Sequence, residues 1–86
     1  MTKAAQGEID AIGLLCPLPV LKLQKALRAL KPGQQVTLLA TDPASRIDVP
    51  HFCAQSGHRV VETRQDSETL IYLVECGAAP RAEQDA

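Results

Sequence analysis

Aromatic residues are almost absent from this sequence. Its 86 residues include one Phe, one Tyr and no Trp, so aliphatic side chains must form any core. Stacking of unpaired bases needs flat side chains, and their scarcity argues against binding of single-stranded nucleic acid. Nine basic and ten acidic residues nearly cancel to a net charge of −1, which gives no bulk attraction to phosphate backbones. We therefore expect no strong direct nucleic-acid binding.

Long apolar runs are also lacking. No run approaches the roughly 18 residues that a membrane span needs, and the start "MTKAAQGEIDA" has no apolar signal-peptide core. We expect a cytoplasmic protein with no membrane partner. The length suits one small domain, which we place at residues 8–77. Residues 1–7 and 78–86 are small, polar and without periodicity, and predict loose chain ends.

The cysteines form no disulfide or metal framework. Cys16, Cys53 and Cys76 are odd in number and far apart, which fits neither a secreted disulfide set nor a CxxC motif. The spacing of His51, Cys53 and His58 matches no common zinc site, so we expect no metal and no cofactor. Core packing is the simpler interpretation of Cys53, and a relay or disulfide with Cys16 is the alternative. We interpret Cys76 as incidental.

The spacing of apolar residues predicts a βαβαββ order. Strands are expected at residues 9–12, 35–41, 59–65 and 69–75, with a hairpin turn at 66–68. A helix is expected from residue 17, with apolar side chains at 20, 23, 27 and 30. The start signals at 42–43 and 48–50 predict one helical turn, a break and a second helix over 49–56. The result is an α/β fold, a two-layer sandwich with two helices on one face of a four-stranded mixed sheet.

Cys16 lies in the stretch "GLLCPLPVLKL", residues 13–23. A residue before proline is driven into extended conformations, so we predict Cys16 as the helix N-cap, with Pro17 first and Pro19 third in the helix. Leu18 then supplies the N–H for the cap. The positive helix N-terminus favours a thiolate, which predicts a pKa of about 7 to 8 for Cys16 instead of about 8.5.

The surroundings of Cys16 favour a sulfur relay over hydrolysis. A hydrolytic cysteine needs a base, and no histidine lies near it in the sequence. A relay thiol needs exposure, a rigid mount, moderate nucleophilicity and apolar surroundings that a partner can cover. Gly13, the prolines and Leu18 are the expected supporting residues. We interpret Asp42 and Asp48 as helix caps only.

A basic stripe follows along the same predicted helix. It consists of Lys22, Lys25, Arg28 and Lys31, and its simplest interpretation is a solvated helix face. The alternative is a docking surface for an acidic partner. This stripe also supports a second hypothesis for the whole chain, a protein- or RNA-binding regulatory module that uses the basic face of the first helix.

The residues from Gly13 to Pro19 match a CPxP signature, and the sequence resembles the TusA-type (SirA-like) sulfur-carrier family. The similarity continues through "LKPGQQV", "ATDPASRIDVPHFC" and "SGHRVVE". It implies a βαβαββ sandwich in which Cys16 carries a persulfide. The sulfur would come from a cysteine desulfurase or a rhodanese-like donor and pass to a downstream acceptor protein. End uses in the family include tRNA thiolation, molybdenum-cofactor assembly and sulfur oxidation.

The sequence departs from the family pattern beside the cysteine. Leu15 stands where the best-known members often have Arg, and Leu18 where many have Glu. Both changes make the rim of the cysteine more apolar. They leave the expected chemistry unchanged and bear on which partner docks there.

Overall fold

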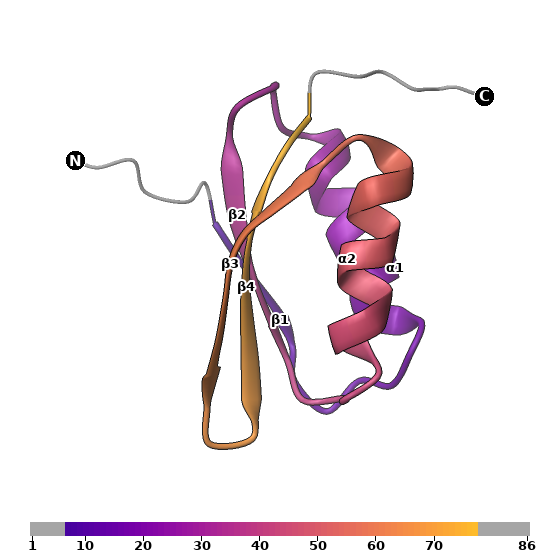
Figure 1. Cartoon of the computed structure of the whole chain (residues 1–86), viewed down its shortest axis with the longest axis vertical. Helices are drawn as coiled ribbons and strands as arrows, with labels where there is room; N and C mark the ends of the chain where they lie inside the picture. Colours follow the sequence, from indigo (N-terminus) through magenta and orange to yellow (C-terminus); the bar gives the residue numbers. More distant parts are fainter. Residues whose placement is uncertain (1–6, 78–86) are drawn as a thin grey trace.

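The computed structural model describes residues 7–77, which form a four-stranded sheet with two helices on one face (Figure 1). Strand β1 runs parallel to β2, while β4 runs antiparallel to both β2 and β3, in the order β1-β2-β4-β3. The predicted βαβαββ sandwich with a mixed sheet is confirmed. The predicted chain ends lie outside the described residues, except for Gly7. The elements are β1 (Glu8–Ala11), α1 (Leu18–Arg28), β2 (Gln35–Ala40), α2 (Ser45–Ser56), β3 (Arg59–Asp66) and β4 (Thr69–Glu75).

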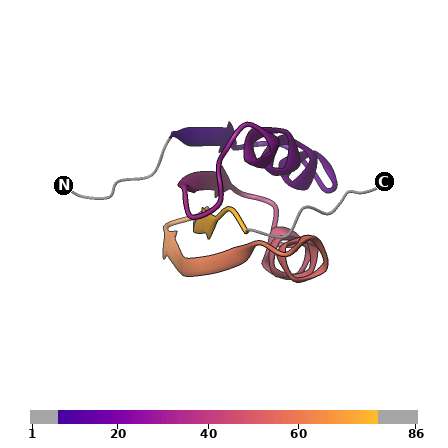
Figure 2. The same ribbon diagram turned by 90° about the horizontal axis from the view of Figure 1, so that it is seen from above.

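The two central strands, β2 and β4, supply most of the core. Their residues alternate between buried and half-buried along the whole length, because successive side chains of a strand point to opposite faces. The buried set faces the helices and is aliphatic apart from Tyr72. It consists of Val36, Leu38, Ala40, Leu70, Tyr72 and Val74. Strand β3 is an edge strand with mostly exposed side chains, and Figure 2 shows the sheet and the helices as two layers.

Helix α1 packs its predicted apolar stripe on the sheet. Leu23 and Leu27 are buried, and Val20 and Leu30 pack against the core from its margin. The helix begins at Leu18, one residue later than predicted. The chain crosses from β1 through α1 to the parallel strand β2.

Helix α2 is continuous, so the predicted break between two short helices is wrong. Pro50 lies inside it, where it has no N–H to donate to the carbonyl of Arg46. The helix continues because Val49 and Cys53, one turn apart, are both buried against the core. It ends at Gly57, whose φ of 81° is the left-handed conformation typical of a glycine at a helix end.

A buried hydrogen bond ties the start of α2 to the centre of the sheet. The hydroxyls of Ser45 and Tyr72 lie 2.8 Å apart, and these residues are only 2% and 1% exposed. Ser45 is the first residue of α2, so this bond holds the helix end that faces the candidate site. Within residues 7–77 no helix is long and apolar enough to cross a membrane.

Candidate functional site

Two loops meet at one end of the molecule. Strands β1 and β2 are parallel, so the loop after each one leaves from the same edge of the sheet (Figure 1). The backbone N–H of Gly13 donates to Oγ1 of Thr41 over 2.9 Å. The backbone N–H of Cys16 donates to Oδ2 of Asp42 over 2.7 Å. The β1–α1 loop, which carries Cys16, is therefore fastened to the connection between β2 and α2.

Cys16 lies one position before the N-cap of α1, so its prediction as the capping residue is wrong. Pro17 is the N-cap, Pro19 is the second helical residue, and no side chain caps the helix. The N–H of Leu18 donates to the carbonyl of Leu15 over 2.9 Å instead of to Cys16. The Cys16–Pro17 peptide bond is cis. The thiol is in no disulfide, is exposed and lies outside the helix.

The Cys16 thiol donates a hydrogen bond to Oδ2 of Asp48, on the first turns of α2. This bond, some loss of solvent and the negative charges of Asp48 and Asp42 raise the pKa of the Cys16 thiol above its ordinary value. The predicted lowering of this pKa is therefore wrong, because the sulfur lies ahead of the helix cap and next to two carboxylates. Asp48 lies inside α2, so its interpretation as a helix cap is also wrong.

Asp42 is not the N-cap of α2, which is Ala44, so its interpretation as a helix cap is wrong, and it instead holds two loop segments together. Its Oδ1 accepts the N–H of Ala44 over 3.0 Å, in the turn that leads into α2, while its Oδ2 accepts the N–H of Cys16. Both backbone donors lower the pKa of this carboxyl group. In the part of the chain that the structure describes, the ion pairs lie on β3 and β4, so neither Asp42 nor Asp48 has a Lys or Arg partner.

The predicted supporting residues surround Cys16 in different ways. Gly13 has a φ of 84°, a left-handed conformation that glycine adopts without strain. Pro19 is buried and anchors the start of α1 to the core. Leu15 and Leu18 are 70% and 47% exposed, so the apolar rim expected around the cysteine is on the surface.

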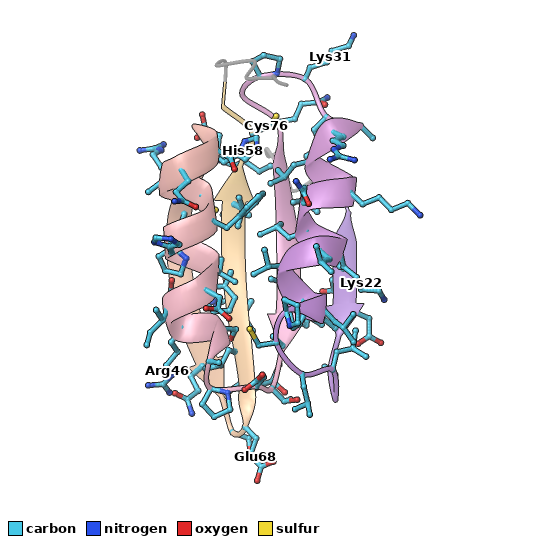
Figure 3. All side chains as sticks on the ribbon, turned by 90° about the vertical axis from the view of Figure 1, so that its right-hand side faces the viewer. Lys22, Lys31, Arg46, His58, Glu68 and Cys76 are labelled. Atoms are coloured by element: carbon cyan, nitrogen blue, oxygen red, sulfur yellow. The ribbon has the colours of Figure 1, made fainter. Side chains whose placement is uncertain are left out.

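The basic residues of α1 face solvent. Lys22, Lys25 and Arg28 are exposed, as is Lys31 beyond the end of the helix. Figure 3 shows Lys22 and Lys31 pointing away from α2. Nζ of Lys22 donates to the backbone carbonyl of Asp10 over 3.0 Å. The stripe thus faces solvent, in agreement with its simplest interpretation.

The other two cysteines are in the core. Cys53 is 2% exposed, and burial raises the pKa of its thiol to about 11, which confirms the core interpretation. Cys76 is 6% exposed, and its Sγ lies 3.7 Å from the carbonyl oxygens of Leu27 and Leu30. Cys16 alone of the three cysteines is exposed. Among the described residues no three His, Cys, Asp or Glu side chains gather as a metal site.

The match to known proteins covers almost all of this structure. The family model described as Sulfurtransferase TusA matches residues 7–75. The chain belongs to this family. It is 40% identical over 74 residues to the sulfur carrier protein TusA of Pseudomonas aeruginosa, covering 86% of this chain and 94% of that protein. It is also 40% identical over 68 residues to the sulfur carrier protein TusA of Pseudomonas syringae, covering 79% of this chain and 81% of that one.

A solved structure shares the TusA fold seen here. The SirA-like protein of Desulfitobacterium hafniense superposes with a TM-score of 0.75 at 30% identity, over 84% of this chain and 99% of that one. Together with the family match, this makes the chain a sulfur carrier of a sulfur relay. The predicted family, fold and carrier function are confirmed.

Sequence reasoning missed the two carboxylates beside the thiol. Asp42 and Asp48 lie 26 and 32 positions from Cys16 in the chain. A signal for Asp42 was present, because the residues after two parallel strands must meet at one sheet edge, and Asp42 follows β2 closely. No comparable signal existed for Asp48, since the sequence predicted a helix break at this residue, whereas the structure has it inside the continuous helix α2.

Proposed function

We propose that Cys16 carries the transferred sulfur as a persulfide. The observation that carries this proposal is its exposure, since Cys53 and Cys76 are buried and Cys16 is open to a partner. Its backbone is fixed by the bond to Asp42, and Pro19 anchors the following helix turn, so the sulfur has a rigid mount. The chain then acts as a sulfurtransferase that moves sulfur from protein to protein.

The loading step needs no redox partner beyond the sulfur donor. The Cys16 thiolate attacks the outer sulfur of a donor persulfide, a new S–S bond forms at Cys16, and the donor's own S–S bond breaks. The electron pair of that bond leaves with the donor sulfur, which takes up a proton and becomes a thiol. A cysteine desulfurase or a rhodanese-like protein is the proposed donor. In delivery, a thiolate of the acceptor protein attacks the outer sulfur of the Cys16 persulfide, and the Cys16 sulfur leaves with the electron pair of the broken S–S bond and takes up a proton. The proposed acceptors belong to tRNA thiolation, molybdenum-cofactor assembly or sulfur oxidation.

The apolar rim supports transfer between proteins. Leu15 and Leu18 lie close to the cysteine in the chain and are both exposed, and exposed apolar side chains that gather in one place are typical of protein interaction sites. A partner that packs on them brings its own sulfur to Cys16 and excludes water from the exchange. Lys22, Lys25 and Arg28 of the basic stripe are the proposed second contact, for an acidic region of the same partner.

Intact-mass spectrometry tests the assignment of Cys16. The native chain incubated with a persulfide donor should gain one sulfur atom that a reductant removes. Cys16→Ser should show no adduct, and the matched variant Cys53→Ala should keep it, with circular dichroism confirming that both variants fold. An adduct of native size on Cys16→Ser would refute the proposal.

A further inference from the structure

The hydrogen bond between Cys16 and Asp48 joins two segments that no motif connects. The thiol comes from the β1–α1 loop and the carboxylate from α2, and both backbones are fixed independently. The acceptor is a charged oxygen, so the bond is of the stronger, charge-assisted kind. A hydrogen bond between two separate elements can fix the orientation of the Cys16 side chain and can also favour the protonated form of its thiol.

The charges around the thiol are all negative. Asp48 faces it from α2, and Asp42 lies beneath its backbone from the β2–α2 connection. Both carboxylates come from outside α1, whose own first turn holds no acidic residue. Lys22 donates to the carbonyl of Asp10 and the guanidinium of Arg46 donates to Gln65, and neither makes an ion pair with Asp42 or Asp48. In the described residues no cation offsets the two carboxylates.

We propose that Asp48 is a positioning residue for sulfur transfer, which aims the Cys16 sulfur and holds its proton on it while the carrier is free. A thiolate next to a carboxylate loses the hydrogen bond and gains repulsion between like charges, so the protonated thiol is the favoured form. The thiolate is the nucleophile in sulfur exchange. The free carrier is therefore held in its less reactive form. Transfer starts when the thiol loses its proton, a step that the negative charge of Asp48 makes less favourable.

This inference rests on the proposed function of Cys16 and adds a control on its reactivity. In the balanced step, the proton that leaves the Cys16 thiol is matched by the proton that the released donor sulfur takes up, and no oxidant is involved. Burial of Leu15 and Leu18 by a partner removes water from the site, which disfavours a thiolate further. A partner that accelerates transfer must therefore offset the Asp48 charge.

The variant Asp48→Asn separates the effect of the carboxylate charge from the effect of the hydrogen bond to the thiol. The amide oxygen of Asn can still accept the thiol hydrogen bond, while the negative charge is lost. Two like unit charges about 4 Å apart in water repel each other enough to lower the acid dissociation constant of the thiol about fivefold, and Asp48→Asn removes this repulsion. A more acidic thiol gives a weaker nucleophile, with a Brønsted slope of about 0.4–0.5. The observed rate at neutral pH should thus rise about two- to threefold, and the plateau at high pH should fall to about half.

The experiment measures the rate at which Cys16 reacts with a neutral pyridyl disulfide as a function of pH, on the full chain, with peptide mapping to follow Cys16 alone. Asp48→Asn should react faster than the native chain at neutral pH and slower at high pH, so that the two profiles cross. The matched control is Glu62→Gln, which removes one negative charge from the exposed β3 strand and should keep the native profile.

Three outcomes would overturn the inference. A profile equal to the native one means that the carboxylate does not act on the thiol. A parallel rise at every pH means that Asn only exposes the sulfur. A slower rate at neutral pH means that Asp48 is a base. None of these bears on persulfide loading, since the probe is a disulfide, and the mass experiment with Cys16→Ser tests that function separately.

Discussion

The buried hydrogen bond between Ser45 and Tyr72 gives a direct test of how the helix layer is held on the sheet. Both hydroxyls are sealed from water, at 2% and 1% exposure, and lie 2.8 Å apart. Tyr72→Phe removes one of them and leaves the Ser45 hydroxyl buried without this partner. A buried polar group in that state costs about 1–3 kcal/mol. Ser45→Ala has the converse effect on Tyr72 and should fall in the same range.

The double variant decides whether the loss comes from the bond. Ser45→Ala with Tyr72→Phe leaves neither hydroxyl stranded, so its loss of unfolding free energy should be clearly smaller than the sum of the two single losses, by about 1 kcal/mol or more. In a domain of this size each kcal/mol lowers Tm by about 4–8 °C, so the single variants should be easy to distinguish from the native chain.

Urea unfolding followed by far-ultraviolet circular dichroism is the suitable assay. The chain has no Trp and one Tyr, so Tyr72→Phe also removes the intrinsic fluorescence signal. The slope of the free energy against urea should stay the same in all four proteins, which shows that the unfolded reference is unchanged. Strictly additive losses would refute the reasoning, since they would mean that the two hydroxyls stabilise the fold independently of each other.

Two further predictions concern the basic stripe of α1 and the close backbone contact between Gly77 and Gly57. Lys22→Glu with Arg28→Glu should slow sulfur loading from a donor protein severalfold and leave loading from inorganic polysulfide at the native rate; equal rates from both donors would remove the docking role. Gly77→Ala should lower the unfolding free energy by about 1–3 kcal/mol in urea, because its Cβ would lie 1.6 Å from the carbonyl oxygen of Gly57. Gly7→Ala, with nothing within 4 Å of the added Cβ, is the matched control and should unfold as the native chain does.

Most of the fold follows from local patterns in the sequence. The alternation over β2 and β4 and the stripe with Leu23 and Leu27 each specify one buried face, and the short connections leave few ways to combine them. Helix α2 was the exception, because Asp48 and Pro50 repeat a helix-start signal in its middle. Burial of Val49 and Cys53 on one face outweighs the hydrogen bond that Pro50 removes, and this burial depends on the finished sheet.

The reactivity of Cys16 is the property least visible in its own motif. The prolines place the sulfur near the start of α1, and from this local geometry a lowered thiol pKa was a sound expectation. A shift of a single residue moves the sulfur ahead of the cap, and the fold then adds carboxylates from positions 42 and 48. A direct hydrogen bond to a charged oxygen acts at shorter range than the partial charges of a helix end, so the carboxylates decide the direction of the shift. The motif thus points to the sulfur that we propose as the reacting atom, whereas the segments that the tertiary structure brings to it determine how readily that sulfur gives up its proton.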